Sequence, residues 1–182
     1  MATDTFVMNG QSFSFETKPG VFAQYGLDKG SKLLLDVVCH CERQSILDLG
    51  CGCGFIGIVL AGLIPISKVL CVDSDIRAIN LTKENIKKNG LANVETLISD
   101  VTSNIPTNLK FDLVVSNPPT HQGREVLVQF IQAAHDVLNR YGTAYFVVNR
   151  MSSVLHRLEE IFGNSEKIDK REGYIVFKAV RM

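Results

Sequence analysis

Short apolar runs alternate with longer stretches that carry helix signals along most of the chain. The apolar runs have few polar interruptions, which is typical of strands buried on both faces of a sheet. They predict strands at residues 45–50, 68–73, 94–100, 111–117 and 143–149. The stretches between and after them end at a glycine, a proline or a turn, and they predict helices at residues 54–64, 74–90, 124–140 and 152–164. The helix over 124–140 is expected to hold Arg140 in its last turn, ahead of a turn at Tyr141 and Gly142.

The N-terminal part of the chain carries different signals. Residues 5–17 alternate around Asn9-Gly10, a strong indication of a hairpin with a two-residue turn. A helix should follow, with Asp28 or Ser31 as its cap. Its apolar stripe consists of Leu34, Val37 and Val38.

Strands that alternate with helices predict right-handed βαβ units and a mostly parallel sheet with helices on both faces. We therefore expect an α/β fold, doubly wound and Rossmann-like. The tail over residues 166–180 predicts an antiparallel hairpin at one edge. The whole chain, 1–182, is expected to form one domain, with an N-terminal addition over 1–44 and a core over 45–182.

The composition is that of an ordinary soluble protein, with 182 residues of which 46% are hydrophobic and 21% charged. No apolar run reaches the roughly 20 residues that a membrane span needs, and the first residues lack the pattern of a signal peptide. We therefore expect a cytoplasmic protein without membrane contact. The formal net charge is zero, so a nucleic-acid substrate would have to be held by a local basic patch.

Five cysteines raise the question of a metal site. Cys39, Cys41, Cys51 and Cys53 form two C-x-C pairs, whereas structural zinc sites use C-x₂₋₄-C spacing. Five is also an odd number and the spacing is not that of a disulfide framework. We expect no metal, and free cysteines that pack as small hydrophobic residues.

Polar residues stand where the predicted strands end, and ligands of such folds bind outside the carboxyl ends of the strands. The first strand leads into the glycine-rich run Asp48 to Gly54, and the second strand ends at Asp73. The third ends at Asp100, the fourth at Asn117 and the fifth at Asn149-Arg150. Core packing does not explain a polar group at each of these ends, so the pattern indicates a binding site along this rim.

Two cofactors fit parts of this rim. Gly52 to Gly57 reads G-x-G-x-x-G and Asp73 follows about 20 residues later, as in a dinucleotide fingerprint. S-adenosylmethionine needs polar groups for an amino acid, a ribose and an adenine. Asp48 and the glycines could serve the methionine part, Asp73 the ribose hydroxyls and Asp100 the adenine amine. The dinucleotide hypothesis leaves Asp48, Asp100 and Asn117 without a role.

The motifs DLGCGCG, VDS, ISD and SNPP resemble those of class I S-adenosylmethionine-dependent methyltransferases. The Asn-Pro-Pro version is that of enzymes that methylate a planar nitrogen. From Phe22 onward, FAQYGLDKGSKLLL and SNPPTHQG are similar to the catalytic domain of small-subunit ribosomal RNA guanine-N2 methyltransferases. The resemblance implies S-adenosylmethionine as cofactor and RNA as partner. The cofactor contacts that it implies are Asp48, Gly50, Cys51, Gly52, Gly54, Asp73, Ser74, Asp100, Val101 and Asn117.

Asn117, Pro118 and Pro119 are the expected catalytic residues. An exocyclic amine is a poor nucleophile because its lone pair is delocalised into the ring. The Asn117 side-chain carbonyl and the Pro118 backbone carbonyl could accept both of its hydrogens and localise that pair. Prolines fix φ and carry no N–H, so the two acceptors would be held rigidly.

The family often has an aromatic residue after the prolines, which stacks on the target base; here Thr120 stands there. Stacking is then expected from Phe22, Tyr25 or His121. The cations expected near the substrate phosphates are Lys18, Lys29, Arg124 and Arg150.

Guanine N2 of ribosomal RNA is our first expectation for the methylated atom, ahead of adenine N6 and the side-chain amide of a protein glutamine. An NAD(P)-dependent oxidoreductase and a non-catalytic binding domain are the alternatives from other classes. The sequence does not give the modified nucleotide, the form of the RNA substrate or the oligomeric state.

Overall fold

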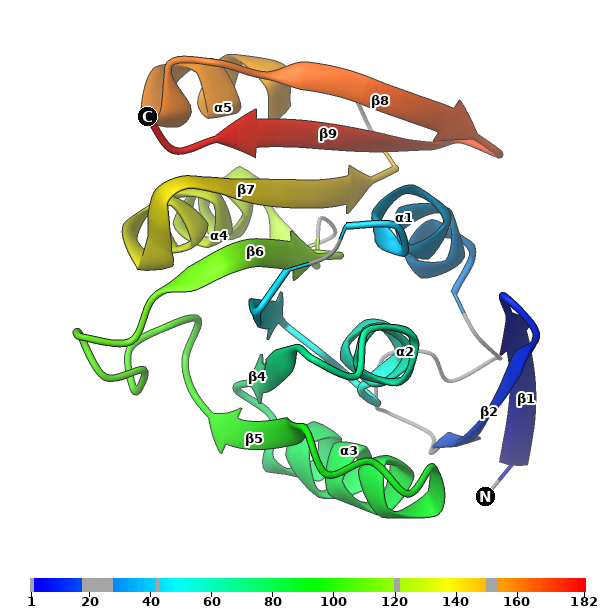
Figure 1. The fold of residues 1–182 in the computed structure, drawn as a ribbon. Helices are drawn as coiled ribbons and strands as arrows, with labels where there is room; N and C mark the ends of the chain where they lie inside the picture. The colour runs from blue at the N-terminus through cyan, green and yellow to red at the C-terminus, as the bar shows by residue number, and fades with distance from the viewer. Residues whose placement is uncertain (1, 18–27, 42, 120–121, 150–153) are drawn as a thin grey trace.

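The computed structural model describes residues 2–17, 28–41, 43–119, 122–149 and 154–182. Its centre is a seven-stranded sheet with the strand order β5-β4-β3-β6-β7-β9-β8 (Figure 1). The strands are β3 Ser45–Leu49, β4 Lys68–Asp73, β5 Val94–Ile98, β6 Phe111–Ser116, β7 Leu138–Val148, β8 Glu166–Arg171 and β9 Tyr174–Val180. Strands β3 to β7 pair in parallel, and β9 is antiparallel to both β7 and β8.

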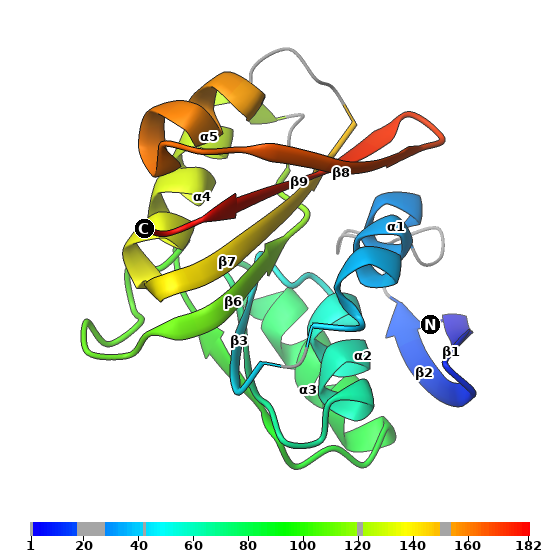
Figure 2. The ribbon, with the colours of Figure 1, turned by 45° about the horizontal axis from the view of Figure 1, so that its top comes forward.

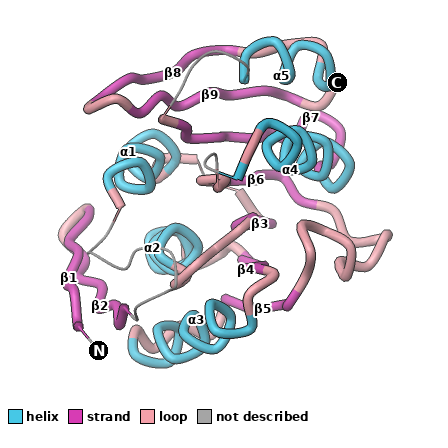
Figure 3. Tube along the Cα trace, turned by 180° about the vertical axis from the view of Figure 1, so that it is seen from behind, coloured by secondary structure: helices cyan, strands magenta, loops and turns pink. Residues whose placement is uncertain are grey.

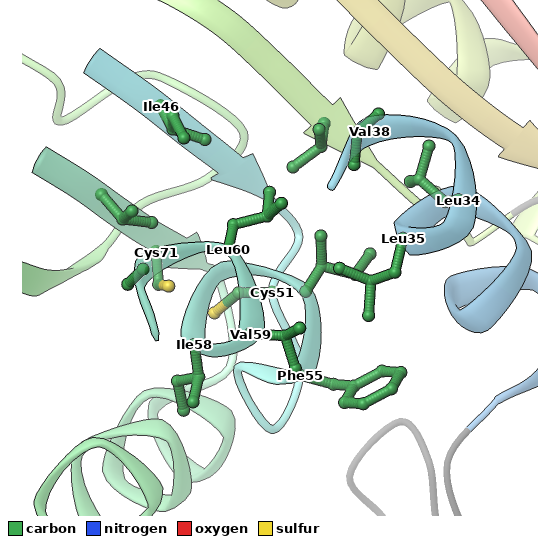
Figure 4. Packing of buried hydrophobic residues seen from close by; sticks show 14 of the residues in the cluster. Leu34, Leu35, Val38, Ile46, Cys51, Phe55, Ile58, Val59, Leu60 and Cys71 are labelled. Carbon is green, nitrogen blue, oxygen red and sulfur yellow. The ribbon is translucent and has the colours of Figure 1, made fainter. Parts of the chain in front are cut away.

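Two hydrophobic clusters cover the two faces of this sheet, because side chains of a strand alternate between faces. Along β6, Leu113 and Val115 belong to one cluster and Val114 to the other. The first cluster contains residues of α1 Lys29–Val38, α2 Phe55–Leu63 and α3 Ile76–Lys88; the second contains residues of α4 Arg124–Val137 and α5 Val154–Phe162. Figure 3 shows the helices around the sheet from behind, and Figure 4 shows α2 packed between the strands and α1. The predicted doubly wound, mostly parallel sheet with an antiparallel C-terminal hairpin is confirmed.

The N-terminal hairpin of β1 Ala2–Met8 and β2 Gln11–Thr17 forms a separate two-stranded sheet, as predicted from Asn9-Gly10. It lies beside α2 and α3 (Figure 2). Its apolar face is buried: Phe15 is fully buried, and its ring meets the Phe55 ring edge-on at 5.2 Å. The hairpin thereby extends the first cluster beyond the helices.

Two asparagines, Asn85 of α3 and its C-cap residue Asn89, bond to the outer edge of β2 as a neighbouring strand would. Asn85 accepts from the Glu16 amide at 2.7 Å and donates to the Glu16 carbonyl at 3.1 Å. Asn89 does the same for Ser14, at 2.9 and 2.8 Å. Positions i and i+4 share one helix face, and residues two apart share one strand edge. The two amides therefore satisfy four backbone groups in register.

The junction of α4 and β7 differs from the prediction. The helix ends at Val137, so the expectation that it extends to Arg140 is wrong. Leu138 is fully buried and pairs with Phe111 of β6, and the Asn139 amide donates to the Asp112 carboxylate at 2.8 Å. Residues 138–140 therefore belong to β7, which pairs with β6, and they do not continue the helix. The predicted turn lies within β7, where the register shifts and Tyr141 has a φ of 65°.

Candidate active site

A pocket of about 310 Å³, including its open mouth, lies at the carboxyl ends of β3 and β6. Its walls come from the start of α1, the glycine loop after β3, the start of α2 and the residue after β6. The lining residues are Asp28, Ser31, Gly50, Cys51, Cys53, Phe55, Ile56 and Asn117. The pocket therefore brings together two of the predicted motifs, the glycine loop and Asn-Pro-Pro.

The glycine loop needs its glycines for conformation and for space. Gly50, Gly52 and Gly54 have φ of 77°, 57° and 83°, a region that side chains disfavour. A Cβ at Gly54 would lie 2.6 Å from the Thr82 methyl group, and the Thr82 hydroxyl donates to the Gly52 carbonyl at 2.9 Å. The loop thus packs closely against α3, and Gly50 and Cys51 line the pocket.

Asp48 lies beneath this loop and not in the pocket lining. Its side chain is buried and accepts from the Gly57 amide of α2 at 2.8 Å. Burial raises the pKa of Asp48 to about 7. The carboxyl group therefore braces the start of α2, and its predicted contact with a cofactor stays a prediction.

Asp73 ends β4 and ties the loop to the next helix. One carboxylate oxygen accepts from the Gly52 amide at 2.9 Å and the other from the Asp75 amide at 2.9 Å. Each oxygen has a second lone pair, so the fixed carboxylate can accept from two further donors. Asp75 caps α3. A carboxylate with this geometry suits a vicinal diol.

The end of β5 lies next to Asp73, because the Ser99 amide donates to the Asp73 carbonyl at 2.9 Å. Asp100 follows and is exposed, and Val101 is half-buried with a φ of 50°. Ser74 is exposed on the same rim. Asp73 and Asp100 therefore follow neighbouring strands at the same rim, and neither aspartate lines the pocket. Their contacts with a cofactor stay a prediction.

The Asn117 side chain has a fixed orientation. Its amide nitrogen donates to the Asp28 carboxylate at 2.7 Å and to the Ser31 hydroxyl at 2.9 Å. Both hydrogens of the amide are thereby engaged, so the carbonyl oxygen is the atom that Asn117 can offer to a ligand. Pro118 is buried and Pro119 half-buried. Asp28 and Ser31, expected only as caps of α1, therefore also belong to the site, which no local sequence signal indicates.

Several predicted substrate residues lie outside the described residues: Lys18, Phe22, Tyr25, Thr120, His121 and Arg150. Arg124 is exposed at the start of α4, and Lys29 is ion-paired with Glu172. The structure thus gives positions for only two of the expected phosphate contacts.

The cysteines are free and four of the five are buried. Burial raises the pKa of Cys53 to about 12, so its thiol is protonated at neutral pH. Within the described part of the chain, no three His, Cys, Asp or Glu side chains converge on a point where a metal could bind. No described helix is long and apolar enough to cross a membrane.

A seven-stranded sheet of this order, with a glycine loop after its first strand and Asn-Pro-Pro after its fourth, defines the chain as a Rossmann-like methyltransferase. More specifically, the chain belongs to the methyltransferase small domain family, which it matches over residues 12–178.

Three relatives illustrate the range of this family. The uncharacterized protein YbxB of Bacillus subtilis is 32% identical over 184 residues, which is 99% of this chain and 92% of that protein. The ribosomal RNA small subunit methyltransferase C of Cronobacter sakazakii is 33% identical over 171 residues, 92% of this chain and 49% of that enzyme. Among solved structures, a 16S rRNA N2 guanine methyltransferase of T. thermophilus, RsmC, in complex with AdoMet and guanosine has a TM-score of 0.91. It is 28% identical and covers 100% of this chain, which spans 50% of that enzyme.

The chain therefore spans about half the length of the two enzymes with a stated activity, and nearly all of YbxB.

Proposed function

We propose that this protein transfers a methyl group from S-adenosylmethionine to the N2 amine of a guanine in ribosomal RNA. The observation that carries the proposal is the fixed Asn117 amide, which can offer its carbonyl oxygen to a donor in a pocket shared with the glycine loop. Support for the substrate comes from the ribosomal RNA enzymes to which the chain is similar over at least 92% of its length.

The donor set around the rim fits S-adenosylmethionine better than a dinucleotide. Asp73 is held by two backbone amides with a lone pair left on each oxygen, as two ribose hydroxyls require. The glycine loop offers its backbone to the methionine part, and Asp100 is exposed beside it for the adenine amine. A pyrophosphate at the same loop would instead lie near the Asp73 carboxylate, which already accepts from the Gly52 amide. When bound, the cofactor supplies an electrophilic methyl group on a sulfonium.

The residues of the chain then act on the amine. The Asn117 carbonyl accepts one amine hydrogen and the Pro118 carbonyl accepts the other, which localises the nitrogen lone pair. Because these acceptors are fixed before the substrate arrives, they stabilise the positive charge that develops on the nitrogen. In-line placement of the two reactants lowers the barrier further. As the nitrogen–methyl bond forms, the methyl–sulfur bond would break with its electron pair left on sulfur, and the nitrogen would release one proton to water.

The test of the activity is methyl transfer from tritiated S-adenosylmethionine to total RNA, small ribosomal subunits, DNA and protein extract in parallel. We expect label in RNA or subunits and N2-methylguanosine after nucleoside analysis. Label in N6-methyladenosine or in protein glutamine would show that the proposed substrate, guanine N2, is wrong and that the labelled group is the substrate. If calorimetry showed binding of NAD(P) and no binding of S-adenosylhomocysteine, S-adenosylmethionine would not be the cofactor.

The Asn117→Ala variant tests the role of the amide. We expect kcat to fall by about 100-fold or more, because a preorganised polar contact to the transition state is lost. Affinity for S-adenosylhomocysteine should stay the same. Asn80→Ala, which truncates an exposed asparagine of α3, is the matched control. Unchanged transfer by Asn117→Ala would disprove this role.

A further inference from the structure

Asp28 connects three distant parts of the chain at the pocket. One of its carboxylate oxygens, Oδ2, accepts from the Ser31 amide at 2.8 Å, from the Ser31 hydroxyl at 3.2 Å and from the Asn117 amide at 2.7 Å. The other oxygen, Oδ1, accepts from the Tyr174 hydroxyl at 3.3 Å. Asp28 is therefore more than the N-cap of α1.

The chemistry of this contact decides which way the Asn117 amide faces. A carboxylate only accepts hydrogen bonds, whereas an amide has a donating and an accepting end. Next to Asp28, Asn117 must present its NH₂ group to the carboxylate, and its carbonyl then points elsewhere. The reversed amide would set two acceptors against each other and would offer donors to an amine that needs acceptors.

A residue of the C-terminal hairpin, Tyr174, holds the Asp28 carboxylate in place. The Tyr174 ring lies against Gly30, where a Cβ would be 2.7 Å from a ring carbon. Lys29, next to Asp28, is ion-paired with Glu172 in the turn between β8 and β9, and Figures 1 and 2 both show this turn beside α1. Burial and the neighbouring Asp28 raise the pKa of Tyr174, which keeps the phenol a hydrogen-bond donor.

We propose that Asp28 is a positioning residue for methyl transfer, which acts by holding the Asn117 carbonyl toward the target amine. The carboxylate sets the orientation, and Ser31 and Tyr174 hold the carboxylate. This inference rests on the role proposed for Asn117 and names the residue on which that role depends.

Two substitutions separate this role from helix capping. Serine caps helices as well as aspartate does, but its shorter side chain cannot hold both Ser31 and Asn117. Asparagine can place its carbonyl where Oδ2 lies and donate its NH₂ to the Tyr174 oxygen. We therefore expect Asp28→Ser to lower kcat by about 100-fold, as for other misplaced catalytic groups, and Asp28→Asn to recover most of this loss.

The affinity for S-adenosylhomocysteine should be the same in both variants. Asp36→Asn is the matched control, because Asp36 is exposed on the same helix and bonds to Arg171 away from Asn117. A kcat of wild-type size in Asp28→Ser would overturn the proposal. Equal losses in Asp28→Ser and Asp28→Asn would overturn it too, since charge rather than orientation would then matter.

A second measurement does not depend on methyl transfer. The side-chain NH₂ signals of Asn117 can be assigned in ¹⁵N NMR spectra by their loss in Asn117→Ala. We expect slow hydrogen exchange of these protons in the wild type and in Asp28→Asn, and fast exchange in Asp28→Ser. Equal protection in Asp28→Ser would overturn the proposal. If guanine turned out not to be the substrate, the proposed function would fail while this result would stand.

Discussion

At the scale of single residues, the site depends on polar side chains that neighbouring groups hold in place. The hydrogen bonds to these neighbours decide which donor or acceptor of each side chain is left for a ligand. Asp73 is fixed by two backbone amides, Asn117 by Asp28 and Ser31, and Asp48 by Gly57. In the first two cases the fixed group keeps an acceptor for a ligand. Asp48 is different, because it is buried with one amide partner and its charged form is disfavoured there.

Asp48 should make the stability of the protein depend on pH. Its pKa is raised from 3.8 to about 7 in the folded chain, so the folded state holds a proton that the unfolded state has lost. Its contribution is present below the unfolded pKa and is lost as the pH rises through the folded pKa. Asp48→Asn removes this dependence and keeps an acceptor for Gly57.

We expect the free energy of unfolding of Asp48→Asn, relative to the wild type, to rise by on the order of 3 kcal/mol between pH 5 and pH 8. Urea unfolding at both pH values measures it. A constant difference between the two proteins would show that Asp48 titrates in its usual range.

At the scale of elements, Asn85 of α3 and the C-cap residue Asn89 replace the strand that β2 lacks on its outer edge. Asn85 is fully buried and also donates to the Cys53 carbonyl of the glycine loop at 2.9 Å. One side chain thus joins the hairpin, the helix and the loop, and so fixes the hairpin relative to the loop that lines the pocket.

Asn85→Asp should be strongly destabilising although it hardly changes the size of the side chain. The carboxylate cannot donate to the Glu16 and Cys53 carbonyls, and a buried charge would face them. We expect a loss of about 3 kcal/mol in the free energy of unfolding. Asn80→Asp, at an exposed position of the same helix, is the control and should change little. Equal effects of the two substitutions would contradict the role of Asn85.

Most elements could be predicted from the sequence because local signals and burial agree. The strands are short apolar runs, Asn9-Gly10 marks the turn of the N-terminal hairpin, and Asp28 marks the start of α1. The prediction failed at Leu138 to Arg140, where pairing with β6 overrides the helix signal. It also missed Asp28 in the site, because its contact with Asn117 spans 89 positions and leaves no local pattern.

At the scale of the whole molecule, charge is balanced, with 19 basic and 19 acidic residues. Several described cations are already paired with carboxylates, among them Lys29, Lys88 and Arg171. The surface therefore has no net excess of positive charge for non-specific phosphate contacts. Under the proposed function, recognition of RNA would come mainly from the pocket and its surroundings.

We expect weak and only slightly salt-dependent binding to a naked ribosomal RNA fragment. The binding constant should fall by less than about tenfold between 50 and 200 mM salt, since few phosphates are neutralised. Titration by fluorescence anisotropy over this range measures the slope, with a basic RNA-binding protein as comparison. A fall of about 10³-fold or more would indicate six or more phosphate contacts and would contradict this picture.

The contact between Asp28 and Tyr174 also bears on how the site is assembled during folding. The two residues lie 146 positions apart, and Tyr174 belongs to β9, which is inserted between β7 and β8. Contacts across such long loops carry a high closure entropy and slow the folding of the chains that need them. The glycine loop is built from residues much nearer in sequence. Cofactor binding and the proposed amine activation thus depend on parts of the chain with very different contact orders. The set of contacts around Asp28 that is proposed to orient Asn117 is complete only once the C-terminal hairpin is in place.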